Sequence, residues 1–122
     1  MQDKSHYTRY NYKKLYELAV EMFIRYGIDI GRIKVDAKPE VVEDRLSMAV
    51  IDAHDGMGQL ASIQGMQLAI DKAKKYGVGM VSVRNSNHFG IAGYYSMMAA
   101  KQGLMGVSMT NAEALVVPTY AR

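Results

Sequence analysis

Short, valine-rich apolar runs alternate with longer stretches of helical periodicity along this chain, and no other feature constrains its fold as much. Residues 46–52 and 78–84 are predicted strands because they are short, apolar and flanked by turn residues. A further strand is predicted at residues 104–109, and helices are predicted at residues 58–76 and 91–102. Since strands that alternate with helices favour βαβ units, we expect an α/β fold whose mixed or parallel sheet is covered by helices.

The first part of the chain predicts a helix followed by a polar connector. Apolar side chains recur every three or four positions between residues 12 and 26, which is typical of an amphipathic helix, and Gly27 is expected to end it. Residues 29–44 are polar, and we expect one short extended piece within them, at residues 32–35. In the helix predicted at residues 58–76, one face is expected to gather Leu60, Ile63, Gln67, Leu68 and Ala73.

Length and composition limit the class of protein. A chain of 122 residues suffices for one compact domain. We expect a helical segment at residues 1–28 and one compact α/β unit at residues 29–122. No run approaches the roughly 18 apolar residues of a membrane span, and the N-terminus lacks the apolar core of a signal peptide, so we expect a cytoplasmic protein. The absence of cysteine excludes disulfides, thiolate zinc sites and cysteine nucleophiles, and we assign no metal ligands.

The net charge of +3 is unevenly distributed. The first fourteen residues are basic and contain several tyrosines, a mixture that can bind phosphates and stack on bases but is also typical of a solvated helix start. We favour the helix start because nothing else in the chain extends the basic stripe. Between residues 85 and 121 the charged residues are Lys101 and Glu113 alone. Such an apolar region has to be covered by the rest of the domain, by another copy or by further polypeptide.

A glycine motif at residues 56–61, Gly-Met-Gly-Gln-Leu-Ala, follows a predicted strand and begins a predicted helix. This pattern and context match a dinucleotide-binding turn. The next strand, however, ends in Arg84 and Asn85, where an acidic ribose-binding residue would be expected, although an arginine could instead bind a 2′-phosphate. The alternative, which we favour, is that the glycines let a helix start close to the sheet.

A polar loop at residues 85–95 carries His88 just beyond a predicted strand. Open α/β sheets place their ligands at the carboxyl ends of strands. Histidine exchanges protons near neutral pH and serves most often as a general acid or base. His88 is therefore a candidate catalytic residue, and a loop histidine that only ties backbone groups together remains the alternative.

Four segments together carry a specific resemblance: Ile-Asp-Ala-His-Asp-Gly-Met-Gly-Gln at residues 51–59, residues 69–79, Asn-Ser-Asn-His-Phe-Gly-Ile-Ala-Gly-Tyr-Tyr at residues 85–95, and Thr110-Asn111 with Pro118. From about residue 31 to residue 120 the chain resembles the malate/L-lactate dehydrogenase family, which includes ureidoglycolate and sulfolactate dehydrogenases and diketogulonate reductase. The resemblance implies an α/β fold that is not the Rossmann fold. It also implies hydride transfer between NAD or NADP and a 2-hydroxy or 2-oxo acid.

The resemblance implies roles for individual residues. His88 corresponds to the active-site histidine of the family, beside the substrate carbonyl and the nicotinamide. Asn85 and Ser86 belong to the same loop, and Thr110 and Asn111 correspond to a pair that ends the next strand near the cofactor. These four residues are the candidate cofactor-binding residues.

The chain departs from the family pattern at both ends. The family binds the substrate carboxylate with a Ser-His-Gly-x-x-Arg motif placed after two helices, whereas here Ser-His-Tyr-Thr-Arg at residues 5–9 precedes the first predicted helix. His6 and Arg9 are the candidate substrate-binding residues. The family also continues beyond residue 122 with most of the cofactor pocket, a catalytic aspartate and a dimer-forming domain. We therefore expect part of a larger fold that works as a homo-oligomer or with a complementing chain and is inactive alone.

Three hypotheses follow. The first is a fragment or rearranged member of this oxidoreductase family, acting on a small 2-oxo or 2-hydroxy acid such as malate or lactate, with no nucleic acid or membrane partner. The second is a non-catalytic folding or assembly module derived from the family. The third is a small nucleic-acid-binding protein that uses the basic N-terminus.

Overall fold

The computed structural model describes residues 5–111, and within the first helix it describes side chains at residues 14, 17 and 18 and from residue 20 onward. The elements are, in order, α1 (Ser5–Asp29), β1 (Glu40–Asp44), β2 (Met48–Gly56), α2 (Gly58–Tyr76), β3 (Met80–Ser86) and α3 (Ala92–Ala100). No helix in this part of the chain combines the length and apolarity needed to cross a bilayer.

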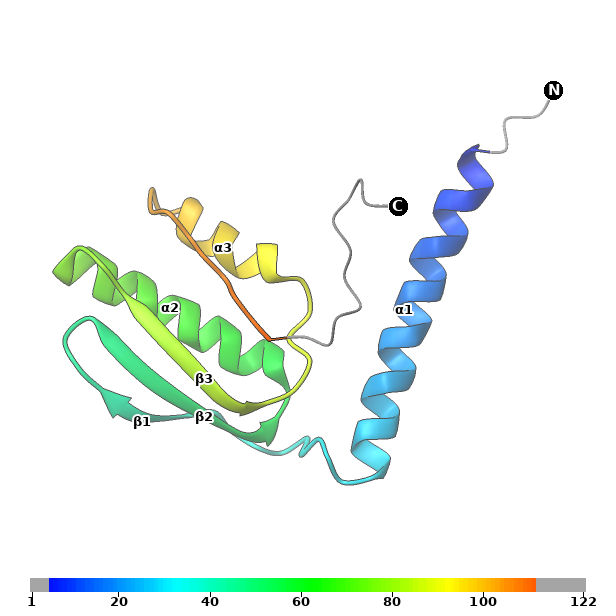
Figure 1. Ribbon diagram of the computed structural model, residues 1–122, viewed down its shortest axis with the longest axis horizontal. Helices are drawn as coiled ribbons and strands as arrows, with labels where there is room; N and C mark the ends of the chain where they lie inside the picture. Colours follow the sequence, from blue (N-terminus) through cyan, green and yellow to red (C-terminus); the bar gives the residue numbers. More distant parts are fainter. Residues whose placement is uncertain (1–4, 112–122) are drawn as a thin grey trace.

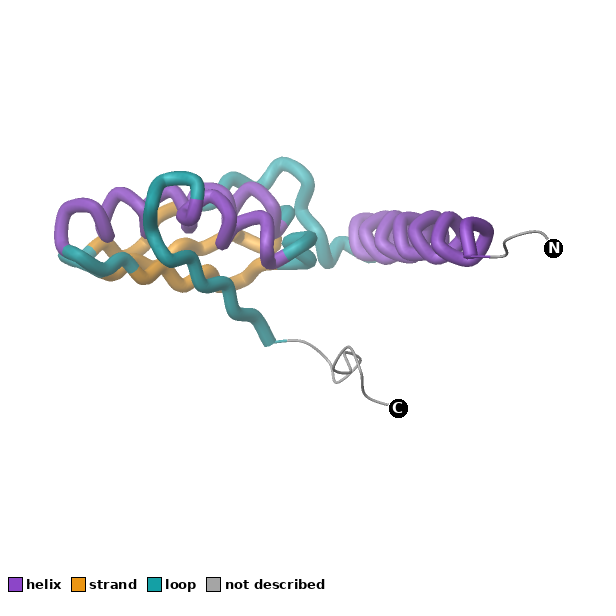
Figure 2. The backbone as a smooth tube through the Cα atoms, turned by 90° about the horizontal axis from the view of Figure 1, so that it is seen from above, coloured by secondary structure: helices purple, strands orange, loops and turns teal. Residues whose placement is uncertain are grey.

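The strands form one mixed sheet in the order β1-β2-β3. β1 pairs antiparallel with β2, and β2 pairs parallel with β3 across the α2 crossover. α2 packs on β2 and β3, and α3 packs on α2, so both helices lie on the same side of the sheet (Figures 1 and 2). The predicted α/β class, with a mixed sheet and helical cover, is confirmed.

The core between α2 and the sheet combines one large side chain, Ile51, with small residues of the helix and the strand. Ile51, Ala53 and Ala61 are buried, with valines of β3 packed against them. Gly65 lies over this layer, where an added Cβ would be 3.5 Å from Val81 and Val83. Small side chains let the helix approach the sheet closely, which larger side chains at these positions would prevent.

The predicted packing face of α2 is wrong. Leu60 and Ile63 are 57% and 41% exposed, and Gln67 is also exposed. The face that meets the sheet instead carries Ala61 and Gly65. Hydrophobicity alone pointed to the larger side chains, whereas the close approach of helix and sheet favours the smallest ones.

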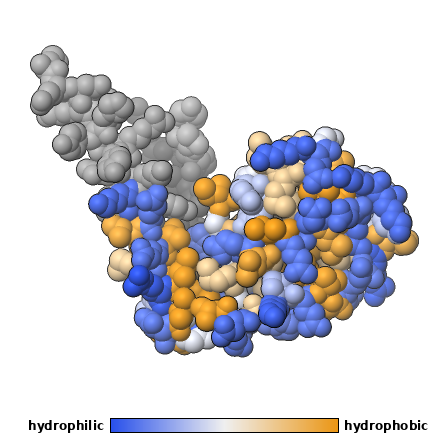
Figure 3. Space-filling model, turned by 180° about the vertical axis from the view of Figure 1, so that it is seen from behind, coloured by the Kyte–Doolittle hydropathy of each residue, from blue (hydrophilic) through white to orange (hydrophobic). Residues whose placement is uncertain are grey.

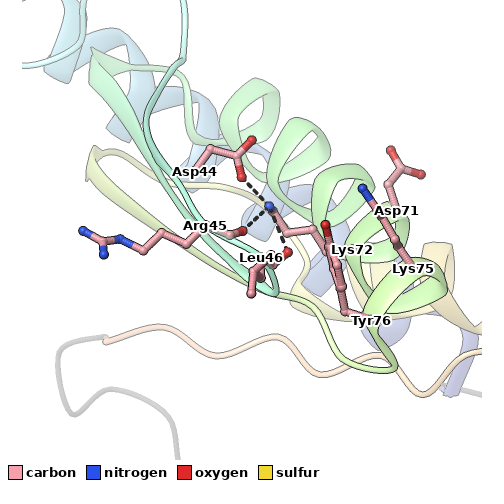
Figure 4. Close-up of a pocket in the computed structure, with 7 residues that line it drawn as sticks. All are labelled: Asp44, Arg45, Leu46, Asp71, Lys72, Lys75 and Tyr76. Carbon is pink, nitrogen blue, oxygen red and sulfur yellow. Dashed lines mark hydrogen bonds and ion pairs between the residues drawn. The ribbon is translucent and has the colours of Figure 1, made fainter.

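A buried lysine attaches α2 to the turn between β1 and β2. The ammonium group of Lys72 donates to the carboxylate of Asp44, to the carbonyl of Arg45 at 2.6 Å and to the carbonyl of Leu46 at 3.4 Å (Figure 4). A hollow of about 550 Å³ lies beside this cluster. Because β2 runs from this turn toward its carboxyl end, the cluster lies at the opposite end of the sheet from the loop that follows β3.

The prediction of an extended segment at residues 32–35 is wrong. The strand within the polar connector at residues 29–44 is β1. Residues 32–36 form bends and turns, in which the Ala37 N–H donates to the Lys34 carbonyl at 3.2 Å. All five residues of β1 are exposed. An edge strand without a buried face shows no apolar alternation, so its sequence carried no strand signal.

The strand predicted at residues 104–109 is also wrong, since this segment is not paired with β3 (Figure 2). It lies against α3 instead. Gly106 packs on the Ser96 backbone, and the hydroxyl groups of Ser96 and Ser108 lie 2.9 Å apart. Met105 and Met109 are left 92% and 88% exposed. Packing on α3 takes the place of the predicted strand pairing.

α1 is longer than predicted, because it begins at Ser5 and continues through Gly27 to Asp29. Gly27 lies inside the helix and does not end it; it packs on the Ile33 side chain, from which an added Cβ would lie 2.7 Å away. The turn comes at Gly31, whose φ is +72°. Toward its N-terminus, α1 extends away from the sheet (Figure 1). Apolar side chains of α1, among them Leu18, Met22 and Tyr26, are exposed. The face of the molecule seen from behind also shows apolar residues at its surface (Figure 3).

Candidate active site

The connections that follow β2 and β3 meet at the carboxyl edge of the parallel pair. In the β2–β3 register, Asp52 lies opposite Arg84 and Gly56 lies opposite Ser86, so β2 contains two extra residues between them. This bulge and the loop after β3 therefore face each other. They bring together residues that are about 30 positions apart in the sequence.

His88 lies in the loop between β3 and α3, partly buried. Its Nδ1 accepts a hydrogen bond from the Gly90 N–H at 2.9 Å. A nitrogen that accepts cannot carry the proton, so the neutral ring is protonated on Nε2. The Phe23 ring of α1 lies 6.4 Å from the His88 ring, centroid to centroid. The ring is thus fixed in one tautomer, with Nε2 able to donate.

Asn87 ties the same loop to the bulge of β2. Its amide nitrogen donates to the Asp55 carbonyl at 2.8 Å and to the Gly56 carbonyl at 3.2 Å. A longer bond of 3.4 Å reaches the Arg32 carbonyl in the connector. One side chain therefore satisfies carbonyl groups from two segments and holds the backbone next to His88.

The other end of the loop is held by α3. The buried Tyr95 donates its hydroxyl to the Phe89 carbonyl, and the two rings stack with centroids 5.4 Å apart. Burial raises the pKa of Tyr95. This residue therefore stays a neutral hydrogen-bond donor across the physiological range of pH, so the loop is held on both sides of His88.

Asp52 is a buried carboxylate at this edge, 5% exposed. It accepts from the His54 N–H at 2.8 Å, from the Arg84 Nε at 2.9 Å and from the Asn85 amide at 2.9 and 3.1 Å. The His54 N–H is the main cause that holds the pKa of Asp52 below its ordinary value, and Asn85 and Arg84 act in the same direction against burial. Asp52 is therefore ionised at neutral pH.

Charged groups on the rim of the bulge are paired with one another. The Nε2 of His54 lies 3.2 Å from the Glu40 carboxylate, and the Lys34 ammonium lies 3.1 Å from the Asp55 carboxylate. All four side chains are largely exposed. Such pairs contribute little to stability, but they cross-link β1, the connector and the bulge.

The start of α2 packs against the loop that follows β3. A Cβ on Gly58 would lie 2.8 Å from the His88 carbonyl oxygen and closer still to that of Asn87. Carbonyl oxygens carry negative partial charge, so their presence beside the first residue of the helix disfavours a bound phosphate there. The glycine therefore serves close packing, as we favoured from the sequence, although the contact is with the loop after β3 rather than with a strand.

The structure gathers part of the predicted site. Asn85 and Ser86 lie at the end of β3, next to the loop that carries His88. Thr110 donates to the carbonyl of its neighbour Asn111 at 3.1 Å, and within residues 5–111 no hydrogen bond joins either residue to that loop. The cofactor role of all four residues stays a prediction.

The predicted substrate residues lie in α1 instead of ahead of a helix. The helix includes the backbone of both His6 and Arg9, while their side chains lie outside the described part of the chain. At the rise of a regular helix, Arg9 is about 20 Å along the axis from Phe23, which contacts His88. The structure therefore does not bring these residues to His88, and their role stays a prediction.

Sequence reasoning did not find how three residues shape the site: Asp52 and Asn87, which received no role, and Gly58, which was weighed only as part of the glycine motif. All three stand inside the motif segments at residues 51–59 and 85–95. Their partners lie about 30 residues away, so no local spacing reveals them. The available signal was Asp52 at the end of the strand predicted at residues 46–52. Because carboxylates are rarely buried without partners, an acidic residue there indicates that donors from other segments lie close to it.

Comparison with known proteins identifies the family. The sequence profile described as malate/L-lactate dehydrogenase matches residues 19–122. Malate dehydrogenase of Pyrococcus abyssi is 47% identical over 102 residues, which are 82% of this chain and 28% of that protein. Malate/(S)-sulfolactate dehydrogenase of Methanothermus fervidus is 48% identical over 92 residues, which are 75% of this chain and 27% of that protein.

A solved structure agrees with the sequence matches. The malate dehydrogenase of Entamoeba histolytica superposes with a TM-score of 0.60 at 51% identity, covering 63% of this chain and 21% of that one. The chain thus spans little more than a quarter of the length of the relatives it matches. Because the profile match includes the whole sheet, both covering helices and the His88 loop, this chain belongs to the malate/L-lactate dehydrogenase family.

Proposed function

We propose that this chain supplies the proton-donating half of the active site of an NAD- or NADP-dependent 2-hydroxy acid dehydrogenase. The observation that carries the proposal is the His88 ring, held at the carboxyl edge of the sheet with Nδ1 accepting from Gly90. Ligands of open α/β sheets bind at that edge. The family membership of the chain supports the reaction class.

In the reducing direction, the carbonyl oxygen of a 2-oxo acid needs a proton as hydride arrives at the carbonyl carbon. His88 provides it from Nε2 as an imidazolium ion, and the same N–H stabilises the negative charge that develops on oxygen. The ring is then left neutral with its remaining proton on Nδ1, and in the oxidising direction this form accepts the hydroxyl proton on Nε2. Both forms carry a proton on Nδ1, so the loop must release the Gly90 N–H bond to Nδ1 before either proton transfer.

The hydride itself is supplied by the nicotinamide of the cofactor. Hydroxyl and amide groups at Ser86, Thr110 and Asn111 are of the kind that would hold the polar atoms of a nicotinamide carboxamide and ribose, whereas the Asn85 amide nitrogen is already bonded to Asp52. The start of α2 does not fit a pyrophosphate, since the carbonyl oxygens of Asn87 and His88 lie against Gly58. We therefore assign Ser86, Thr110 and Asn111 to the nicotinamide end of the cofactor, Asn85 to the support of the loop, and no residue to the cofactor phosphates.

A chimeric enzyme tests the proposal. Residues 19–122 replace the matching segment of the Pyrococcus abyssi malate dehydrogenase, and oxidation of malate, lactate and sulfolactate is measured with NAD and with NADP. We expect turnover of at least one of these acids, because the segment would then carry a competent His88. A folded chimera without turnover of any of them contradicts the proposal.

The variant His88→Ala in that chimera separates catalysis from structure. Loss of a positioned acid is expected to lower kcat by about 10²- to 10⁴-fold with little change in melting temperature. His54→Asn is the matched control, since His54 is an exposed histidine with a φ of +51° that asparagine tolerates. A stability loss of about 1 kcal/mol with unchanged activity per folded molecule would instead make His88 a structural residue and favour the assembly-module hypothesis.

A further inference from the structure

The buried carboxylate of Asp52 lies on the sheet face opposite α2, where nothing in the proposed reaction uses it. Removing a carboxylate from water is unfavourable unless donors replace the lost hydration. Asp52 has four bonds from three residues, His54, Arg84 and Asn85, all between 2.8 and 3.1 Å. The number of donors shows that the surrounding chain is arranged around this carboxylate.

Two of its partners belong to segments with unusual backbone conformations. The φ angles of His54, Asp55 and Asn85 are +51°, +62° and +49°, in the left-handed region that residues with a Cβ rarely adopt. Asp52 accepts from the backbone N–H of His54 and from the side-chain amide of Asn85. One carboxylate therefore stabilises the left-handed turn at each of the two facing connections.

Both turns determine where His88 lies. Asn85 sets the direction in which the chain leaves β3, three residues before His88. The carbonyls of Asp55 and Gly56 that receive the Asn87 amide belong to the bulge that begins at His54. Asp52 is thus bonded to the segment that carries His88 and to the segment against which that loop rests.

We propose that Asp52 is a positioning residue that fixes the His88 loop through its bond to Asn85. The inference rests on the proposed function of His88, and it adds a residue that acts through another group rather than by contact with substrate. Arg84 also donates to the Asp52 carboxylate. The alternative is therefore that Asp52 stabilises the fold through Arg84 and has no effect on the position of the loop.

Hydrogen exchange measured by NMR on the full 122-residue chain distinguishes these roles. The Gly90 N–H is the reporter, because its bond to His88 Nδ1 is lost when the loop shifts. We expect Asp52→Asn and Asn85→Gly to accelerate exchange at Gly90 by about tenfold or more, with no change in the interior of α2. Asn85→Gly keeps the left-handed backbone accessible, so its effect reports the side-chain bond. Arg84→Gln is the control and should leave Gly90 protected.

The nitrogen chemical shifts of the His88 ring give a second signature in the same samples. The wild-type chain should show an unprotonated Nδ1 in the neutral form, and Asp52→Asn should show a mixture of tautomers. Uniformly faster exchange across α2 and the loop, or Arg84→Gln reproducing Asp52→Asn, would make Asp52 a general stabilising residue and overturn the proposal.

Kinetics in the chimera complete the test. Asp52→Asn is expected to lower kcat by about 10- to 100-fold, since a displacement of about 1 Å in a reacting group has effects of this size, while KM changes less. Exchanging the pair in the double variant Asp52→Asn, Asn85→Asp restores the amide–carboxylate bond with its direction reversed, and we expect it to recover most of the lost kcat. No recovery would contradict the proposal. An inactive wild-type chimera would refute the proposed function alone, because the NMR measurements decide the role of Asp52 without turnover.

Discussion

Replacing Gly58 by alanine should move the loop that carries His88. An ordinary Cβ contact is 3.4 Å or longer, whereas the new Cβ would lie 2.8 Å from the His88 carbonyl oxygen and closer to that of Asn87. Both obstacles are backbone atoms, which cannot rotate away as a flexible side chain would. The loop has to retreat by about 1 Å or the helix start has to shift, and overpacking of this kind destabilises by about 1–3 kcal/mol.

Gly65→Ala is the matched control, because it adds the same methyl group to the same helix. Its Cβ would meet Val81 and Val83 at 3.5 Å, an ordinary contact, and alanine is favoured over glycine in a helix interior by about 1 kcal/mol. We therefore expect Gly65→Ala to be as stable as the wild-type chain or more stable. The two variants should differ by about 2–4 kcal/mol in the free energy of unfolding.

Urea unfolding followed by circular dichroism measures this difference. With a denaturant slope of about 1–3 kcal/mol per molar for a small domain, the two midpoints should be separated by about 0.7–4 M. In the chimera, Gly58→Ala should also lower kcat by about 10²-fold if His88 is displaced by about 1 Å. If Gly58→Ala proves as stable as Gly65→Ala, the close contact between α2 and the loop does not exist in solution, and the account of this glycine fails.

Three further outcomes are expected. The chain alone should bind NADH and NADPH weakly or not at all, since carbonyl oxygens lie against the start of α2, and a calorimetric affinity in the low micromolar range would contradict this. Exposed apolar side chains such as Ile91 and Met105, 72% and 92% exposed, should drive self-association, so a stable monomer at high micromolar concentration in analytical ultracentrifugation would refute it. Because folding holds the pKa of Asp52 below its ordinary 3.8, its contribution to stability is complete above that pH and is lost as the pH falls through the lower folded value. The urea midpoints of the wild-type chain and Asp52→Asn should therefore differ at pH 7 and converge in acid, and a constant gap would show that the charge is not responsible.

The sequence predicted those elements whose ends carry local signals. The bounds of α2 were predicted as observed, because Gly58 begins the helix and Gly77 ends it with a φ of +85° and an N–H bonded to the Ala73 carbonyl at 2.8 Å. α3 begins one residue later and ends two residues earlier than the predicted range of 91–102. β1 was missed because pairing with β2 defines it, and the sequence of an exposed edge strand does not record its partner.

The sequence predicted where the candidate site lies in the fold, but it predicted only part of the contacts within the site. His88 stands out because a polar segment follows a valine-rich strand, and that reasoning needs no knowledge of distant contacts. The bond between Asp52 and Asn85 joins residues 33 positions apart. It depends on the parallel register of β2 and β3 and on the bulge that shifts it, neither of which a single sequence displays.

The contacts at the carboxyl edge also explain how residues that touch no substrate are expected to affect turnover. The His88 loop rests on the carboxyl end of β2 and the start of α2 through three kinds of contact: the Asn85 amide on Asp52, the Asn87 amide on two carbonyls, and its own carbonyls against Gly58. Each contact fixes backbone rather than a flexible side chain, so a change in any of them moves the whole loop. The Lys72 cluster is bonded to the turn at the other end of the sheet and to no part of this loop in the described residues, so substitutions there should change the free energy of unfolding without changing kcat. A substitution is therefore expected to lower kcat when it displaces the end of β2 or the start of α2, on which the loop rests. Its distance from His88 along the sequence does not predict this effect.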